Sequence, residues 1–310
     1  MKTLLVGYKA ADLFERGKHG KKFTAKWLDD KCVCHTLDIY HRHAIEKTHH
    51  IKTVCSAHLP QGPWDLIKFR TGPKLMSGEL SLDLLQEIHL LKPSRFELEF
   101  VGKERDKNEL LAKIRTDPDR VRDFSSKWPA SVPSGDKLMF TSVPGCFCHR
   151  RLDEGGLALA EVISRELSHS QAINPHILDM GCGCGLVGFL IKSVIKEASL
   201  VMVDSHSRAV EAARINAENF AMPAEIILAD NGVPVRMDGT FDVFAGNPPY
   251  YSDYRIAEVF LETAKRALKP GGVCYSVVKN DAGLRPVQER YFSSVEVIRR
   301  RGYCVLKSVK

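Results

Sequence analysis

Two short stretches of the sequence carry residue types that could do chemistry. In Asp179-Met-Gly-Cys-Gly-Cys-Gly185, an aspartate is followed by glycines on alternate residues. In Asn247-Pro-Pro-Tyr250, a carboxamide is followed by two prolines and an aromatic ring. Glycine permits a positive φ or the close approach of a ligand to the main chain. Proline has no N–H, so the Asn247 side-chain oxygen and the Pro248 carbonyl remain as acceptors. The first stretch predicts a ligand-binding turn. The second predicts a rigid cup, formed by residues 247–250, that holds an amine.

The ligand of the glycine turn follows from its charge. A dinucleotide site would show Gly-x-Gly-x-x-Gly and rest a pyrophosphate on the start of a helix. Here the carboxylate of Asp179 would repel a diphosphate and attract an ammonium group. The favoured ligand is an amino acid that carries a nucleoside, such as S-adenosylmethionine, and the alternative is a glycine-rich turn that binds nothing. The predicted cofactor-binding residues of this turn are Asp179, Gly181, Cys182, Gly183 and Gly185.

Polar residues follow two further apolar runs, which we expect to be the next strands of the same sheet. The run 198–204 ends in a carboxylate, and an acid at the tip of the second strand of a nucleotide-binding sheet hydrogen-bonds ribose hydroxyls. The run 225–231 also has a polar tip, which suits the edge of an adenine ring. These tips add Asp204, Ser205, Asp230 and Asn231 to the predicted cofactor-binding residues, and Asn247 belongs to them as well.

The cup at the fourth strand, 241–246, predicts the reaction. The lone pair of a nucleobase amine is delocalised into the ring, so two acceptors that draw its hydrogens out of plane would localise that pair. We therefore predict in-line methyl transfer, with catalysis mainly by positioning and electrostatics and with the proton lost afterwards to water. Tyr250 could stack on the base, and the alternative is a surface turn. The predicted catalytic residues are Asn247, Pro248, Pro249 and Tyr250.

The elements around these stretches predict an α/β fold. The second half alternates strand and helix five times, which is typical of a doubly wound parallel sheet, and closes with an antiparallel pair at 295–298 and 303–309. In the first half, apolar runs predict strands at 3–7, 32–38, 51–57, 64–69 and 95–101. Helices are expected at 10–14, at 81–91 with Ser81 as the N-cap, and at 108–114.

The two halves share a spacing that suggests an internal repeat. Asp65 lies 27 residues before Lys92, and Asp242 lies 27 residues before Lys269. Asp38 is interpreted as the counterpart of Asp204. We interpret this as a duplication with loss of the cofactor site in the first copy, and the alternative is that any two α/β domains share such intervals.

The polar, proline-bearing segment near residues 117–136 predicts the domain boundary. The predicted domains are 1–128, a degenerate methyltransferase-like domain for RNA docking or structure; 129–137, a linker; and 138–310, a catalytic domain.

The composition indicates which kinds of partner and ligand to expect. The formal net charge of +7 lies wholly in residues 1–150, which hold 26 Lys and Arg against 19 Asp and Glu. A basic half suggests a surface for a polyanion, and the alternative is ordinary solvated lysines. The three Cys-x-Cys pairs among nine cysteines lack the usual spacing of zinc ligands, so no metal and reduced thiols are expected. We expect no membrane span and no signal peptide, hence a cytoplasmic protein.

With these residues together, the second half resembles class I S-adenosylmethionine-dependent methyltransferases of the Asn-Pro-Pro-Tyr/Phe type. The whole chain resembles the RsmC/RlmG group of ribosomal RNA guanine-N2 methyltransferases, also through Pro144-Gly-Cys-Phe147 and Leu152-Asp-Glu-Gly-Gly156. The resemblance covers 138–310 well and the first half as architecture only. It implies tandem Rossmann-like domains with a degenerate N-terminal one, S-adenosylmethionine as cofactor, and ribosomal RNA or a ribosomal subunit as partner, with a monomer favoured.

By this resemblance, Gly181 and Gly183 contact the methionine part of the cofactor, Asp204 the ribose and Asp230 the adenine. Tyr250 stands where the guanine-N2 members commonly carry Phe. Adenine-N6 and protein glutamine-N5 targets therefore stay open, as does a non-catalytic RNA-binding assembly factor that keeps the fold.

Overall fold

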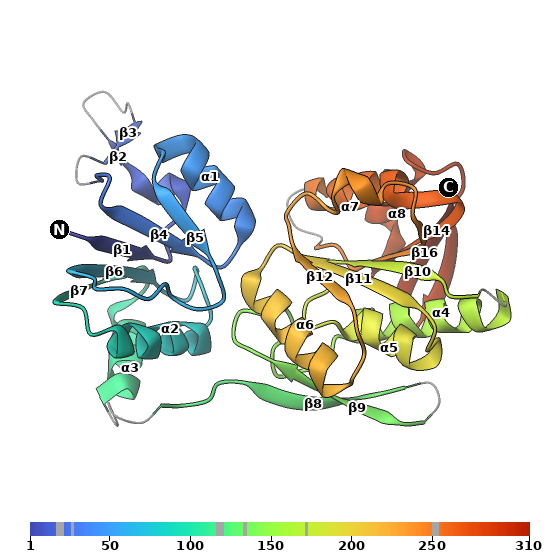
Figure 1. Cartoon of the computed structure of the whole chain (residues 1–310), viewed down its shortest axis with the longest axis horizontal. Coiled ribbons are helices and arrows are strands. Elements are labelled where there is room, and N and C mark those ends of the chain that lie inside the picture. The colour runs from blue at the N-terminus through green and yellow to red at the C-terminus, as the bar shows by residue number, and fades with distance from the viewer. Residues whose placement is uncertain (17–21, 26–27, 116–120, 133–134, 171–172, 250–253) are drawn as a thin grey trace. The chain divides into compact units, whose positions relative to one another are not determined.

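The computed structural model describes residues 1–310 apart from 17–21, 26–27, 116–120, 133–134, 171–172 and 250–253 (Figure 1). The chain divides into two compact units. Unit 1 comprises Met1–Ser125, Val143–Gly145 and His206–Arg208, and unit 2 comprises Ser126–Ser142, Cys146–Ser205 and Ala209–Lys310. Strand β8 (Ser126–Ser131) pairs with β9 (Lys137–Ser142), so residues 129–131 of the expected linker lie in a strand of unit 2.

Unit 1 is built on a five-stranded parallel sheet with helices on both of its faces (Figure 1). Leu4 of β1 packs with Leu84 of α2 on one face, and Leu5 packs with Ile45 of α1 on the other, because side chains alternate along a strand. In sheet order, the strands are β5 (Lys52–Cys55), β4 (Cys32–Thr36), β1 (Thr3–Val6), β6 (Leu66–Thr71) and β7 (Arg95–Phe100). The other elements are η1 (Ala10–Leu13), the hairpin β2 (Phe14–Arg16) and β3 (Lys22–Thr24), α1 (Ile39–His49), α2 (Gly78–Leu91) and α3 (Glu104–Arg115).

Unit 2 is built on a seven-stranded sheet. In sheet order the first five strands are parallel, the sixth is antiparallel to the fifth, and the seventh is antiparallel to the sixth. In sheet order, the strands are β12 (Glu225–Leu228), β11 (Ser199–Asp204), β10 (His176–Met180), β13 (Phe241–Gly246), β14 (Leu268–Val278), β16 (Tyr303–Val309) and β15 (Glu296–Arg300). The other elements are α4 (Glu154–Ser170), α5 (Leu186–Val194), α6 (Ser207–Asn219), η3 (Val235–Met237), α7 (Arg255–Ala267) and α8 (Asp281–Glu289).

Helices α7 and α8 cover one face of this sheet, and α4, α5 and α6 cover the other (Figure 1). Phe260 of α7 and Leu284 of α8 join Phe244 of β13 in one buried cluster. The two-faced cover and the parallel strands confirm the predicted doubly wound α/β class.

The two sheets share a strand order and a register. The order β5-β4-β1-β6-β7 in unit 1 corresponds to β12-β11-β10-β13-β14 in unit 2. Thr3 of the central strand β1 pairs with Leu66, as Ile177 of the central strand β10 pairs with Val243. The predicted repeat is therefore confirmed as an equivalence of the two folds.

One hydrogen bond repeats at the same place in both sheets. Asp65 Oδ2 accepts from the backbone N–H of Lys2 at 2.7 Å, and Asp242 Oδ2 accepts from the backbone N–H of His176 at 2.8 Å. Each aspartate comes one residue before the paired positions just described, and so does each partner. The 27-residue interval noticed in the sequence thus begins in both copies at an aspartate with the same structural role.

The equivalence assigned to Asp38 was wrong. Counting along the paired strands from Leu5 and Cys34 in unit 1 and from Asp179 and Met202 in unit 2 makes Thr36 the counterpart of Asp204. Asp38 lies two residues further on and is the N-cap of α1, where its side chain accepts from the backbone N–H of Tyr40.

Other local predictions also needed correction. Helix α2 begins earlier than expected, because Ser77 is its N-cap and accepts from the backbone N–H of Leu80 at 3.2 Å. Ser81 lies within the helix, where its hydroxyl bonds that of Thr71. Residues 10–13 form a 3-10 turn in place of the expected α-helix. Helices α1 and α8 were not predicted.

Within the part of the chain that the structure describes, we find no helix with the length and apolar character needed to cross a bilayer.

Candidate functional site

The glycine turn between β10 and α5 has the positive-φ backbone that its glycines permit. Gly181, Gly183 and Gly185 have φ of +71°, +56° and +87°, a region that disfavours other residues. The backbone N–H groups of Gly181 and Cys182 donate to the carbonyl of Val203 at 2.8 and 3.0 Å. These bonds hold the turn against the end of β11, so the turn is preformed.

The three glycines serve different purposes. A Cβ on Gly185 would come within 2.5 Å of the Phe189 ring, and one on Gly181 would come within 2.8 Å of Phe260, so both positions lack room. A Cβ on Gly183 would meet nothing within 4 Å. Gly183 therefore leaves its main chain open to a ligand, which is the property that the sequence analysis required of this turn.

Two carboxylates accept hydrogen bonds from the backbone of the turn and of the helix that follows it. The side chain of Asp179 is buried and its Oδ2 accepts from the backbone N–H of Gly188 at 2.9 Å, in the first turn of α5. Asp204 Oδ2 accepts from the backbone N–H of Gly183 at 2.9 Å. Sequence analysis placed both acids at this edge correctly, because the carboxyl ends of the parallel strands β10 and β11 lie side by side.

The electrostatics of this edge favour a cation. Burial, together with the nearby negative charges of Asp204 and Asp153, raises the pKa of Asp179 to about 7, although the hydrogen bond from the Gly188 N–H lowers it. The charges of its neighbours thus repel a negative charge on Asp179. A positively charged ligand would relieve that repulsion, whereas an anion would add to it.

The remaining predicted cofactor residues follow the strands as expected, with different exposure. Ser205 and Asp230 are half-buried and Asn231 is exposed. Strand β12 ends at Leu228, earlier than expected, and the next residue, Ala229, donates its N–H to the carbonyl of Asp204 at 3.0 Å. The loop that carries Asp230 is thereby tied to the tip of β11.

The thiol of Cys182 is unsuited to nucleophilic chemistry. Its side chain is buried and burial raises its pKa well above the usual value, with Asp204 and Asp179 adding to the effect. Cys182 can therefore offer a ligand its backbone only. Among the described residues, no three His, Cys, Asp or Glu side chains form a group able to hold a metal ion.

The cup begins where β13 ends, at Gly246. Asn247 is half-buried and its Nδ2 donates to Oδ2 of Asp153 at 2.8 Å. Pro248 is buried and Pro249 half-buried. Tyr250 lies outside the described residues. Because β10 and β13 are parallel neighbours, Asn247 and the glycine turn lie at the same edge of the sheet.

Asp153 is a site residue that the sequence analysis did not single out. It belongs to the segment Leu152-Asp-Glu-Gly-Gly156, which entered the analysis only as part of the family resemblance. Its partner Asn247 is 94 residues away along the chain, so spacing could not reveal the contact. The available signal was an acidic residue at the start of a helix, followed by two glycines, which are unfavourable within a helix.

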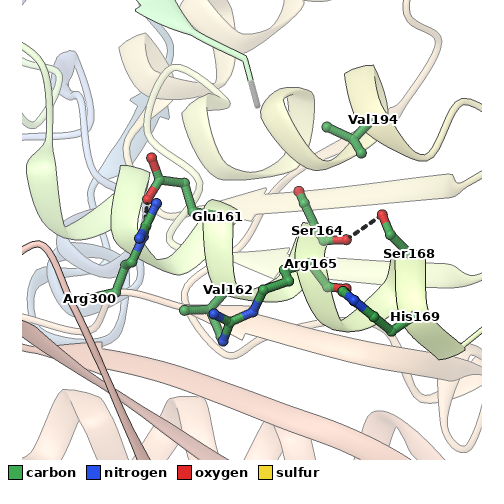
Figure 2. Close-up of a pocket in the computed structure, with 8 residues that line it drawn as sticks. All are labelled: Glu161, Val162, Ser164, Arg165, Ser168, His169, Val194 and Arg300. Carbon is green, nitrogen blue, oxygen red and sulfur yellow. Dashed lines mark hydrogen bonds and ion pairs between the residues drawn. The ribbon is translucent and has the colours of Figure 1, made fainter. Parts of the chain in front are cut away.

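A cavity of about 430 Å³ lies elsewhere in unit 2, beside α4 (Figure 2). Most of its lining residues belong to the middle and C-terminal part of α4. None of the described site residues lines it. Its lining residues are Glu161, Val162, Ser164, Arg165, Ser168, His169, Val194 and Arg300.

The comparison with protein families identifies the family of the chain. Residues 137–307, more than half of the chain, match the model of the methyltransferase small domain. The chain belongs to the methyltransferase small domain family. The matched region contains the glycine turn, the acidic strand tips and the Asn-Pro-Pro-Tyr segment, and it agrees with the extent of the resemblance inferred from the motifs.

Curated relatives carry the name ribosomal RNA small subunit methyltransferase C. The protein of Haemophilus influenzae (strain PittGG) is 29% identical over 179 residues, which are 56% of this chain and 52% of the relative. The protein of Pseudomonas aeruginosa (strain UCBPP-PA14) is 32% identical over 169 residues, 52% of this chain and 48% of the relative. The chain thus spans about half the length of the curated relatives that it matches.

A solved structure shares the fold of the whole chain. It is the T. thermophilus 16S rRNA N2 G1207 methyltransferase (RsmC) in complex with AdoMet and guanosine, with a TM-score of 0.77 and 17% identity. The match covers 100% of this chain and 88% of that one. The prediction of two tandem Rossmann-like units is therefore confirmed as a fold.

Proposed function

We propose that this protein is an S-adenosylmethionine-dependent methyltransferase that methylates the exocyclic N2 amine of a guanine in ribosomal RNA. The observation that carries the proposal is that one edge of one sheet holds both an open glycine turn with acidic support and the carboxamide of Asn247. The first suits a cationic nucleoside ligand, and the second suits an amine. Membership of the methyltransferase small domain family supports the same reading.

In this proposal the cofactor lies at the carboxyl ends of β10 and β11, beside Asp179 and Asp204. When bound, S-adenosylmethionine would supply a methyl group on a positively charged sulfur, together with an ammonium group. The open main chain at Gly183 lets the methionine part approach, and Asp179 and Asp204 favour its positive charge. Asp204 and Ser205 would bind the ribose, and Asp230 and Asn231 the adenine.

The protein's role in the reaction is to hold the amine. The side-chain oxygen of Asn247 and the carbonyl of Pro248 would each accept one hydrogen of the amine and hold its lone pair toward the methyl group. Pro249 stiffens the chain, and we propose that Tyr250 stacks on the base. After transfer the amine is cationic and loses its extra proton to water, so no side chain has to act as a base. Positioning and electrostatics then supply the rate enhancement.

Guanine is preferred over other amine targets on the strength of the comparisons. Several curated relatives are named ribosomal RNA small subunit methyltransferase C, and the T. thermophilus structure is named for N2 methylation of a 16S rRNA guanine. A base must leave its stack to reach such a cup, so we expect an accessible or unfolded RNA region as the substrate. An rRNA substrate also places the protein in the cytoplasm, where we expect a monomer.

Labelled methyl transfer to rRNA tests this function. The purified chain is incubated with methyl-labelled S-adenosylmethionine and rRNA that lacks modifications, and the RNA is digested to nucleosides for mass spectrometry. We expect label in N2-methylguanosine. Label in N6-methyladenosine, in methylglutamine of an added protein extract, or in no product contradicts the proposal and indicates the adenine, glutamine or non-catalytic alternative in turn.

We further propose that the domain 1–128 is a degenerate copy that docks RNA. Its support is the basic excess of residues 1–150, 26 Lys and Arg against 19 Asp and Glu, because phosphate contacts supply most of the salt-dependent affinity for RNA. The exposed Lys74 and Lys103 are suitable probes. The double variant Lys74→Glu/Lys103→Glu should bind RNA more weakly and with a smaller salt dependence, whereas Lys196→Glu in the other unit serves as the control. Equal binding by all three proteins contradicts the docking role.

A further inference from the structure

Asp153 contacts the carboxamide on which the proposed chemistry depends. Its Oδ2 lies 2.8 Å from Nδ2 of Asn247, and both side chains are half-buried. A carboxylate only accepts hydrogen bonds, whereas a carboxamide has one accepting and one donating end. The chemistry of the pair therefore fixes which end of Asn247 faces Asp153. The amino group points to the carboxylate, and the carbonyl oxygen is left for the site.

The carboxylate of Asp153 is itself held in place by the start of α4. Its Oδ1 accepts from the backbone N–H of Gly155 at 3.1 Å, in the manner of a helix N-cap. One oxygen thus serves the helix and the other serves Asn247. Because α4 is a long, buried helix, Asp153 has little freedom to rotate away from the carboxamide.

Gly156 makes room for this arrangement. A Cβ at that position would lie 2.7 Å from Oδ2 of Asp153, the oxygen that bonds Asn247. Gly156 lies in α4, where glycine costs about 1 kcal/mol relative to alanine. The requirement for space beside Oδ2 accounts for a residue that the helix alone disfavours.

From these contacts we propose that Asp153 is a positioning residue of the methyl-transfer site, which orients the Asn247 carboxamide so that its oxygen faces the amine to be methylated. The proposal rests on the proposed function, which assigns Asn247 as an acceptor for that amine. It adds the residue that keeps the acceptor from turning into a donor. Without Asp153, a half-turn of the carboxamide would present an N–H₂ group to an amine and repel it.

A substitution that keeps the helix cap separates positioning from a structural role. In Asp153→Asn, the new side-chain oxygen can still accept from Gly155, since Asn and Asp are equally good N-caps. Its amino group then faces the amino group of Asn247, and the carboxamide of Asn247 relieves the conflict by turning over. We expect normal folding but a fall in kcat of about 100-fold, comparable to the loss of one oriented hydrogen bond in other active sites.

The exchange of the two residues is the matching rescue. In Asp153→Asn/Asn247→Asp, the amino group of the new asparagine can donate to the new aspartate, whose second oxygen again faces the site as an acceptor. Because the acceptor is restored, we expect kcat of this double variant to be at least tenfold higher than that of Asp153→Asn. A tenfold change corresponds to about 1.4 kcal/mol in the activation free energy. Gly156→Ala should displace the carboxylate and lower kcat while it stabilises the helix. Glu154→Gln, next in the chain and bonded to Arg301, is the control with unchanged kcat.

The orientation can also be read without any activity. In protein labelled with ¹⁵N-asparagine, the side-chain amide signals of Asn247 should move in Asp153→Asn and stay in place in Glu154→Gln. If these signals do not move, or if the exchanged pair is no more active than Asp153→Asn, the positioning role is overturned. If the wild type methylates no RNA, the proposed function fails instead, and the amide signals alone decide whether Asp153 holds Asn247.

Discussion

Unit 1 and unit 2 contain the same five-stranded parallel core, yet they differ in the residues that stand at the ends of the strands. The paired strands place Leu5 where unit 2 has the buried Asp179, and Arg70 where it has Asn247. Leu5 is fully buried in an apolar cluster, so unit 1 has an apolar side chain where unit 2 has the acid that bonds Gly188. The comparison teaches that the fold depends on the strands and their shared aspartates, whereas the site depends on a few residues at the strand ends.

The strand ends of unit 1 are occupied by the protein itself. The guanidinium of Arg70 bonds Asp12 at 3.1 Å and Glu99 at 2.8 Å, and the hydroxyl of Tyr8 bonds Glu99 at 3.0 Å. A Cβ on Gly7 would lie 2.2 Å from the carbonyl oxygen of Arg70, and its counterpart Gly181 also lacks room, whereas Gly183 of unit 2 has open space beside it. Ion pairs thus occupy the strand ends of unit 1, whereas the proposed site of unit 2 has open space beside Gly183.

The largest effect should come from giving unit 2 the residue of unit 1. In Asp179→Leu, the support of the glycine turn and its negative charge are lost together, so we expect no measurable binding of S-adenosylmethionine by calorimetry. The mirror variant Leu5→Asp should not create a site, and it should destabilise unit 1 because it buries an unpaired carboxyl group. Retained binding in Asp179→Leu would remove the charge argument from the account.

The next effect concerns the cup. Asn247→Ala removes one acceptor for the amine, and we expect methyl transfer to RNA to fall by about 100-fold or more. Binding of S-adenosylmethionine should stay close to normal, since the glycine turn is untouched. Arg70→Ala at the equivalent place in unit 1 is the matched comparison and should leave the transfer rate unchanged. Near-normal transfer by Asn247→Ala contradicts the role of the cup.

The titration of Asp179 predicts a pH dependence of opposite sign for binding and for stability. The pKa of this group is raised to about 7, so it is neutral below and charged above that pH. The affinity for the cationic cofactor should rise between pH 6 and 8, by at most about tenfold per unit. The folded state holds this proton more tightly than the unfolded chain, so its contribution to stability is lost as the pH rises from about 4 to 7. Asp179→Asn should flatten both profiles, and a binding profile that falls with pH contradicts the assignment.

The smallest effect should be shared by both units. Asp65→Asn and Asp242→Asn each weaken the hydrogen bond that ties the central strand to its neighbour, and each should lower the free energy of unfolding by about 1 kcal/mol. Urea unfolding followed by circular dichroism measures both changes. A large loss in one variant and none in the other means that the two aspartates are not equivalent.

The sequence could predict which candidate residues lie at one edge of the sheet where a single local segment carries them. The glycine turn, Asp204 and Asn247 each follow an apolar run, and parallel strands bring such ends to one edge, so local motifs were sufficient. Asp153 could not be found this way, because its role depends on a contact with Asn247 across the fold. The same limit applied to the counterpart of Asp204 in unit 1, since only the strand register distinguishes Thr36 from Asp38.

The missed helices have local causes. Helix α1 buries only Ile45 and His49 and most of its other residues are polar, so it shows little helical periodicity. Helix α8 contains Pro286, a residue that usually argues against a helix interior. Most strands of the two large sheets were predicted because their residues form short apolar or alternating runs, whereas β2, β3 and β8, which are short or largely polar, were missed.

The most direct test of the central claim is the number of S-adenosylmethionine molecules that one chain binds in isothermal titration calorimetry. The account predicts one molecule per chain, because unit 2 keeps the open turn and its acids while unit 1 fills the same place with Leu5 and the Arg70 ion pairs. A stoichiometry of two would contradict the loss of the site in unit 1. An absence of binding would contradict the presence of a site in unit 2.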